Sequence, residues 1–122
     1  MMPGVRFNIR DERHATGLAI GPGKVALLEA IARTGSITSA AKLLGLSYRR
    51  AWLMVDETNR CLLEPAVETA AGGQKGGGTI LTTEGLELVR RYRAVERQTE
   101  KAVRRDLSVL LRSISPRRPV TR

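Results

Sequence analysis

The segment 35–52 places the strictest limit on how this chain can fold, because it carries the marks of two short helices joined by a glycine. Ser36 is placed to cap the first helix, and Gly45 to end it. Its apolar residues recur at the helical spacing i, i+3, i+4, i+7: Ile37, Ala40, Ala41 and Leu44. Ser47 can cap the second helix, which begins with Tyr48, Arg49 and Arg50. This order predicts a helix-turn-helix, the motif that lays its second helix in the major groove of DNA.

The residues before this segment predict a hairpin and a further helix. Residues 5–10 alternate apolar and polar side chains, the pattern of a half-buried strand, and residues 15–20 hold a second short apolar run. The hairpin would end at the Gly-Pro-Gly of residues 21–23. The apolar period then becomes helical as far as a stop at Gly35. The expected buried face of this helix comprises Val25, Leu28, Ile31 and Ala32.

After a stop at Pro65, two short strand patterns flank a glycine-rich stretch. Val67 and Thr69 precede it, residues 72–78 form it, and Ile80 and Leu81 follow it. Two short strands joined by such a loop would make the wing of a winged helix.

The glycine-rich stretch allows two interpretations. As a wing, it would bring Gln74 and Lys75 to the DNA backbone or the minor groove; as a simple flexible turn, it would have no partner. A nucleotide-binding loop is excluded, because that motif needs Ser or Thr directly after Gly-Lys, and Gly76 follows Lys75.

A long helix is predicted from a cap at Thr82 through residues 83–114, where no proline interrupts. At about 1.5 Å per residue it would be roughly 48 Å long, more than the preceding domain can cover, so its outer half needs another partner. The residues expected on the pairing face are Leu86, Val89, Tyr92, Val103, Leu107 and Leu110. The tail 115–122, with its prolines and arginines, is expected to be disordered.

The predicted fold is therefore mainly α with a small β component. It consists of a winged helix-turn-helix domain with an N-terminal strand or hairpin at 1–82, a dimerisation helix at 83–114 and a basic tail at 115–122.

The charge balance and the scarce residue types narrow the function class. Lys and Arg number 21 against 12 Asp and Glu, which gives +9, so a polyanion is the expected partner. Cys61 and His14 are single residues of their kinds, which excludes an internal disulfide and a zinc site built by one chain. No set of nucleophile, base and orienting acid is recognisable, so we expect neither an enzyme nor a cofactor. Without a long apolar run or a signal-peptide pattern, the chain is expected in the cytoplasm and not in a membrane.

The start of the second helix supplies the candidate base-reading residues. Direct reading of bases needs hydrogen-bond donors on the first turns of a groove-facing helix, and Tyr48, Arg49 and Arg50 lie there. Helical phase lets either arginine bind guanine while the other binds phosphate. The competing interpretation is an ordinary helical hairpin with a solvated basic face. Trp52 and Cys61 are expected in the core.

The start of the supporting helix is a candidate phosphate site, because free amides and short hydroxyls gather there at Ser36 and Thr38. A plain capping role for Ser36 is the alternative. The complete set of candidate DNA-binding residues is Ser36, Thr38, Ser47, Tyr48, Arg49, Arg50, Gln74 and Lys75.

These motifs resemble the N-terminal domain of the ModE-type molybdate-responsive regulators, which is itself similar to the winged helix of LysR-type regulators. The resemblance runs from about Lys24 to Tyr92. The combination of Ser-Tyr-x-x-Ala-Trp with a polyglycine wing is specific to the ModE branch. The matching residues are Gly35-Ser36-Ile37-Thr38, Ala40-Ala41, Gly45-Leu46-Ser47-Tyr48, Ala51-Trp52, Asn59, Glu68-Thr69, Gly72-Gly73, Gly76-Gly77-Gly78, Leu81-Thr82 and Gly85.

The resemblance implies a homodimer in which residues 47–62 form the recognition helix, residues 71–79 the wing, and the long helix pairs two subunits. In the family, separate C-terminal modules of small β-barrels sense molybdate. The sequence ends after the long helix, so only DNA binding and dimerisation are expected to carry over.

Two functions from different classes remain open on the sequence. The favoured one is a dimeric, sequence-specific transcriptional regulator on a palindromic operator, linked to molybdenum-related genes. The alternative is an architectural, nucleoid-type protein that coats DNA through charge alone. An adaptor that binds a separate sensor protein through the long helix is compatible with the first.

Overall fold

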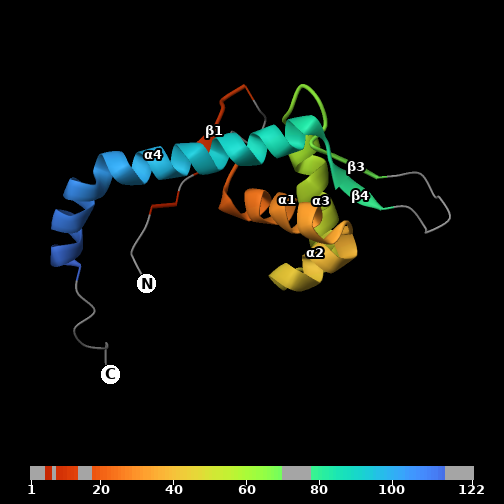
Figure 1. Ribbon diagram of the computed structural model, residues 1–122, viewed down its shortest axis with the longest axis horizontal. Coiled ribbons are helices and arrows are strands. Elements are labelled where there is room, and N and C mark those ends of the chain that lie inside the picture. Colours follow the sequence, from red (N-terminus) through yellow and green to blue (C-terminus); the bar gives the residue numbers. More distant parts are fainter. Residues whose placement is uncertain (1–4, 7, 14–17, 70–77, 115–122) are drawn as a thin grey trace.

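The computed structural model describes residues 5–6, 8–13, 18–69 and 78–114, with only the backbone of residues 18 and 19. Figure 1 shows three short helices gathered beneath one long helix, which crosses over them and continues well beyond. The elements in chain order are β1 (Ile9–Arg10), β2 (Leu18–Ile20), α1 (Pro22–Thr34), α2 (Ile37–Leu44), α3 (Tyr48–Arg60), β3 (Val67–Thr69), β4 (Thr79–Leu81) and α4 (Thr83–Ser113). The winged helix-turn-helix order predicted from the sequence is the order observed.

The helix ends lie where local side-chain chemistry predicts them. The Ser36 hydroxyl accepts a hydrogen bond from the Ser39 amide at 3.0 Å. Gly35 and Gly45 adopt the left-handed conformation, with φ of 74° and 70°, as C-caps of α1 and α2. The cap at Thr82 accepts from the Gly85 amide at 3.0 Å. Residues 83–113 then run as one helix, one residue shorter than expected.

Both strand pairs are antiparallel and short. The sequence predicts a strand over residues 5–10; among the described residues of this segment, only Ile9–Arg10 pair with β2, and Ile9 is 37% exposed. The second pair matches Val67 with Leu81 and Thr69 with Thr79, which is the predicted base of a wing. The expected contacts Gln74 and Lys75 lie outside the described residues.

The main core lies between α1, α2, α3 and the start of β3. Its fully buried members are Leu27, Leu28, Ala30, Ile31, Ala40, Ala41, Ala51 and Ala66. Two positions differ from the helical stripes expected from the sequence: Ala32 is exposed, and Leu44 is 37% exposed. Ala32 is exposed because α1 contacts α2, α3, α4 and β4. The buried face of α1 is therefore wider than the predicted stripe and is rotated toward Leu27 and Ala30.

A second cluster joins α4 to the N-terminal part of the chain. Tyr92 is only 2% exposed and packs with Ile20 and Val25, while Val89 packs against both clusters. The expectation that Tyr92 lies on a face that pairs two subunits is therefore wrong. The N-terminal half of α4 lies on its own domain, where Tyr92 fills the space beside α1. Burial raises the pKa of the Tyr92 hydroxyl, with the Glu96 carboxylate adding to the rise.

An ion pair holds α4 on α1 across 64 positions of sequence. Arg93 donates from Nε to Glu29 Oε2 at 2.9 Å and from Nη2 to Glu29 Oε1 at 2.7 Å, and its Nη1 donates to Glu96 at 2.7 Å. This two-pronged geometry is the strongest form of an arginine–carboxylate pair. Hydrogen bonding to Arg93 lowers the pKa of Glu29 below its ordinary value of 4.5.

Among the described residues, no helix has both the length and the apolar content needed to cross a membrane.

We predict that Glu29→Gln removes a pH-dependent share of stability. Because the pKa of Glu29 is lower in the folded than in the unfolded chain, its ionised form stabilises the fold above about pH 4.5, and this share disappears as the pH falls through the lowered value. The side chains of Glu29 and Arg93 are 34% and 32% exposed, so we expect a decrease of about 1 kcal/mol at pH 7 that shrinks toward zero in acid. Denaturant unfolding at several pH values measures it. Glu64→Gln, at an exposed position that forms no ion pair with any described residue, is the control; an equal, pH-independent decrease in both variants would contradict the prediction.

Candidate nucleic-acid interface

Helix α3 buries one side and presents the other to solvent. Ala51, Met54, Val55 and Thr58 form the buried side. The opposite side carries Tyr48, which is 55% exposed, together with Arg49, Trp52 and Leu53. These four residues line a shallow hollow of about 460 Å³. The predicted emergence of Tyr48 and its two arginine neighbours into solvent is thus observed.

Trp52 is 47% exposed, so the prediction that it lies in the core is wrong. Met54 takes the inner position instead, because Ala51 and Val55 centre the buried side and Met54 lies on the same side of the helix. Cys61 is only partly buried, so its expected place in the core is also wrong.

The two candidate arginines differ in position on α3. Arg49 lies two residues before Ala51, about 200° around the helix from it, and lines the hollow with Trp52 and Leu53. Arg50 lies one turn before the buried Met54 and so borders the buried side. The sequence alone could not distinguish the positions of Arg49 and Arg50, but in the structure Arg49 is central on the exposed side and Arg50 lies at its border.

Neither arginine is neutralised by a carboxylate among the described residues. The two acidic residues of α3 are engaged elsewhere: Asp56 pairs with Arg60 at 2.9 Å, and Glu57 lies 3.5 Å from Lys24 on α1. The exposed start of α3 therefore keeps its positive charge, which an anion can use.

The candidate phosphate-binding hydroxyls lie at the two helix starts. Thr38 is exposed on the first turn of α2, and Ser36 is half-buried and caps that helix. Ser47 is exposed and accepts a hydrogen bond from the Arg50 amide at 3.0 Å. A capping hydroxyl uses an acceptor position and keeps its own hydrogen for donation. The geometry thus leaves all three hydroxyls able to donate to phosphate.

Asn59 fixes the wing against α3, a role that the sequence alone does not indicate. Its side-chain oxygen accepts from the amides of Ala66 at 2.8 Å and Val67 at 3.2 Å, and its side-chain nitrogen donates to the Val67 carbonyl at 3.1 Å. At the other strand, the Thr79 amide donates to the carbonyl of Gly35 at 3.0 Å. The base of the wing is therefore attached both to α3 and to the turn between α1 and α2.

The start of α4 is held by the same segment. The Thr82 amide donates to the Ala66 carbonyl at 2.9 Å, and the Thr82 hydroxyl donates to the Pro65 carbonyl at 2.7 Å. A Cβ at Gly85 would come within 2.3 Å of that Ala66 oxygen, so only glycine allows α4 to approach this closely.

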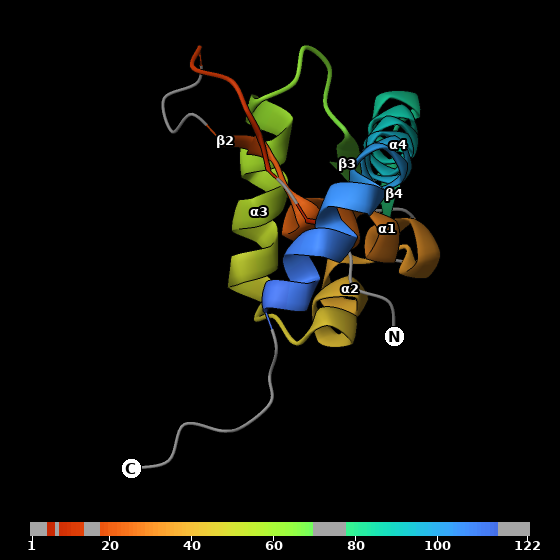
Figure 2. The ribbon, with the colours of Figure 1, turned by 90° about the vertical axis from the view of Figure 1, so that its left-hand side faces the viewer.

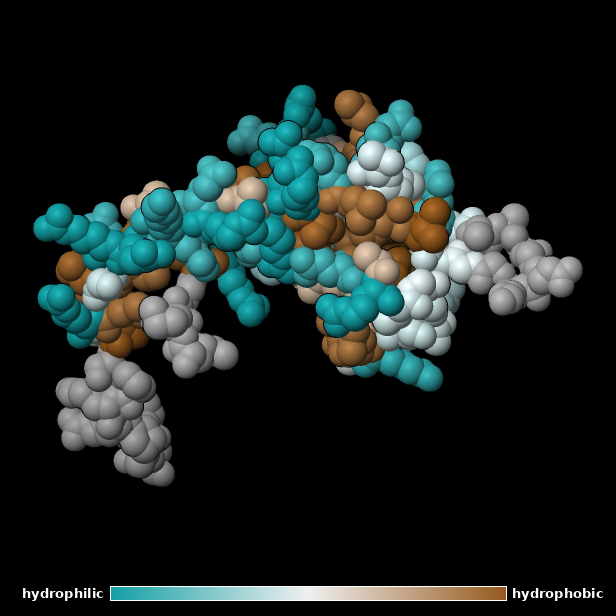
Figure 3. Space-filling view, in the orientation of Figure 1, coloured by the Kyte–Doolittle hydropathy of each residue, from teal (hydrophilic) through white to brown (hydrophobic). Residues whose placement is uncertain are grey.

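Of the remaining dimerisation candidates, Val89 packs against both core clusters, and the other four lie on the outside of α4. Val103 and Leu107 are half-buried, while Leu86 and Leu110 are each 55% exposed. Val109 and Ile114 are exposed beside them. In Figure 3 the far end of α4 carries hydrophobic residues among hydrophilic ones.

Within the described part of the chain, no three His, Cys, Asp or Glu side chains are grouped as metal ligands.

Comparison with known proteins finds relatives that are much longer than this chain. The molybdenum-pterin-binding protein MopB of Rhodobacter capsulatus is 43% identical over 84% of this chain and 40% of its own length. The molybdenum transport protein ModE of Azotobacter vinelandii is 46% identical over 73% of this chain and 33% of its length. The DNA-binding transcriptional dual regulator ModE of Escherichia coli K12 is 40% identical over 66% of this chain and 31% of its length.

The chain thus spans about 40% or less of the length of these curated relatives. No protein-family model matches it. Among solved structures, the multiple antibiotic resistance repressor MarR superposes with a TM-score of 0.52 over 80% of this chain and 78% of its own, at 18% identity. At that identity the likeness concerns the fold alone.

We predict that Asn59→Ala lowers the free energy of unfolding by about 1–3 kcal/mol, because it leaves the buried Ala66 amide without an acceptor. Asn59→Asp keeps that acceptor but turns a carboxylate oxygen toward the Val67 carbonyl, so it should also lower the free energy of unfolding, and by less in acid, where the protonated carboxyl can donate. Urea unfolding followed by circular dichroism gives both values. The exposed neighbour is the control: Arg60→Ala should change stability by less than about 0.5 kcal/mol. A decrease in Asn59→Ala no larger than that of the control would contradict the role assigned to Asn59.

Proposed function

We propose that this chain, a homologue of the ModE-type regulators, binds double-stranded DNA at specific sequences and regulates transcription. The observation that carries the proposal is the exposed start of α3, where Tyr48 and two arginines that pair with no described carboxylate stand on a helix of winged-helix geometry. A groove-facing helix with donors on its first turns is what direct base reading requires.

The positions on α3 suggest separate roles for its residues. Arg49, central on the exposed side, is proposed to bind a guanine edge with two hydrogen bonds. Arg50, at the border of the buried side, is proposed to bind phosphate together with Ser36, Thr38 and Ser47. The apolar surfaces of Trp52 and Leu53 beside Arg49 suit contact with thymine methyl groups.

The architectural alternative is less well supported by this surface. A protein that coats DNA through charge alone requires exposed cations, but it does not require exposed aromatic or aliphatic side chains among them. Here Tyr48, Trp52 and Leu53 are 55%, 47% and 37% exposed around Arg49. Such side chains are costly to leave in water and become useful against base edges.

We further propose that the chain works as a homodimer through the outer half of α4, and therefore on a palindromic operator. The helix of 31 residues is about 46 Å long, and its buried residues, Gly85 and Tyr92, lie in the first third. The exposed apolar side chains beyond them, Leu110 and Ile114 among others, are the surface that a second copy would cover. The biological setting proposed from the names of the relatives is molybdenum-related gene control in the cytoplasm, with any signal reaching the chain through a further domain or a separate sensor protein.

Single replacements on α3 test the proposal. Arg49→Ala should weaken binding to the operator by about 1–3 kcal/mol and relax the preference at one base pair, because its two hydrogen bonds to the guanine edge can no longer form. Arg50→Ala should weaken binding equally on operator and scrambled DNA. It should also make the slope of log affinity against log salt concentration shallower by about 1. Titrations on sites taken from a genome-wide map of bound DNA measure both. Equal affinity of the wild-type chain for operator and scrambled DNA would refute sequence-specific regulation.

Replacement of apolar residues on the outer half of α4 tests the dimer. The double variant Leu107→Asp, Leu110→Asp should be a monomer by light scattering at concentrations where the wild-type chain is a dimer, because it places charges in the pairing face. Leu63→Asp is a matched control, since Leu63 is fully exposed in the loop after α3 and its change should leave the dimer intact. A monomeric wild-type chain would instead favour a heterologous partner for this helix.

A further inference from the structure

The two halves of α4 differ in how their cations are used. In the first half, Arg90 and Arg91 both pair with Glu87, at 2.7 and 2.5 Å, and Arg93 pairs with Glu29 and Glu96. From Arg97 onward, five cations form no ion pair with any described residue: Arg97, Lys101, Arg104, Arg105 and Arg112. The unneutralised charge of the helix is therefore concentrated in its outer half.

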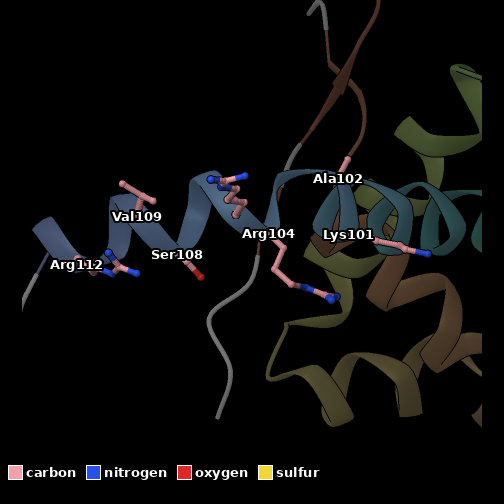
Figure 4. A pocket seen from close by; sticks show the side chains of 7 residues that line it. Lys101, Ala102, Arg104, Ser108, Val109 and Arg112 are labelled. Atoms are coloured by element: carbon pink, nitrogen blue, oxygen red, sulfur yellow. The ribbon is translucent and has the colours of Figure 1, made fainter.

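These five cations share one side of the helix. Counted from Arg97 they lie at steps of 4, 7, 8 and 15 residues, which at 100° per residue keeps them within about 100° of arc. Ser108 lies on the same side, and we call the six residues the distal basic face. Figure 4 shows Arg104 and Ser108 projecting from one side of the helix and Val109 from the other.

The distal basic face is open to solvent and hollowed. All six of its members are exposed, and five of them line a groove of about 570 Å³ together with Ala102 and Val109. The carboxylates on this half of the helix are Glu100, which accepts a hydrogen bond from the Val5 amide at 3.4 Å, and Asp106. Asp106 lies about 150° around the helix from the centre of the face, and no carboxylate lines the groove among the described residues.

The apolar side of the same half-helix points elsewhere. Val103, Leu107, Leu110 and Ile114 follow the spacing i, i+4, i+7, i+11, about 140° around the helix from the distal basic face. A second copy packed on the apolar side would leave the cations uncovered. The distal basic face thus needs a ligand of its own.

We propose that the distal basic face binds the phosphate backbone of DNA, outside the base pairs that α3 reads; this rests on the proposed DNA-binding function. The five cations are spread over about 22 Å along the helix. Double-stranded DNA carries one negative charge per 1.7 Å or so, which matches such a row of positive charges. Arginine, lysine and serine are the side chains that contact phosphates, whereas a protein partner would require an apolar or aromatic centre, and the groove offers only Ala102 and Val109.

The course of α4 supports a shared ligand for the two surfaces. In Figures 1 and 2 the last turns of α4 descend from the level of its first turns toward the side on which α2 and the start of α3 lie. A duplex that runs along this side meets α3 and the distal basic face together. In the proposed dimer this would place the distal cations near the DNA between the two half-sites.

The test compares two double variants that remove the same charge from the same helix. Arg104→Gln, Arg105→Gln should reduce affinity for a random-sequence duplex and make the plot of log affinity against log salt shallower by about 0.9 for each phosphate that the variant no longer neutralises. Arg90→Gln, Arg91→Gln should leave the slope unchanged, because both cations are held by Glu87 and lie outside the distal basic face. Circular dichroism and light scattering establish that both variants keep the helix and the oligomeric state of the wild-type chain.

The outcomes separate this inference from the proposed function. Equal slopes for the two double variants would overturn it, because the effect would then be one of net charge. An unchanged DNA affinity together with weaker binding of polyglutamate would also overturn it, and would assign the face to an acidic protein. A wild-type chain that binds every duplex equally would refute sequence-specific regulation and leave this inference standing, since phosphate contacts need no particular sequence.

Discussion

The backbone of Ala66 is the constraint on which the rest of the structure depends. Its amide donates to Asn59 at the end of α3, and its carbonyl accepts from the Thr82 amide at the start of α4. The absence of a side chain at Gly85 lets α4 come this close. One buried residue thereby fixes α3, the strand pair β3–β4 and α4 relative to one another. The surface that would meet DNA is consequently carried by rigid elements, which base reading requires.

Helix α4 joins two environments in one continuous element. Its first turns are part of the domain core through Tyr92 and through the Arg93–Glu29 pair, while its last turns contact nothing comparable among the described residues. Packing on α1 sets the direction of the whole helix, so the core decides where the exposed outer half lies. A helix as long as this one needs such an anchor, because isolated helices of ordinary sequence are marginal in water.

Charge in this chain is arranged by pairing as much as by number. The acidic side chains of α3, and Glu87 and Glu96 in the first half of α4, are bound to neighbouring cations, whereas Arg49, Arg50 and the distal basic face form no ion pair with any described residue. The net charge of +9 already indicated a polyanionic partner. The pairing pattern adds where on the molecule that partner would be held, and it does so at two separate surfaces.

The sequence by itself determined the element order and the helix ends. Ser36, Ser47, Thr82, Gly35 and Gly45 act within four residues of themselves, so their roles follow from local chemistry. It also placed Tyr48, Arg49 and Arg50 at the start of an exposed helix. Only the tertiary structure decided that Met54 and not Trp52 enters the core, that Tyr92 is buried within its own chain, and that Arg49 is more central than Arg50. A periodic pattern marks which residues share a side of a helix, but the width and direction of the buried side depend on how many other elements cover it, and those contacts join residues far apart in the chain.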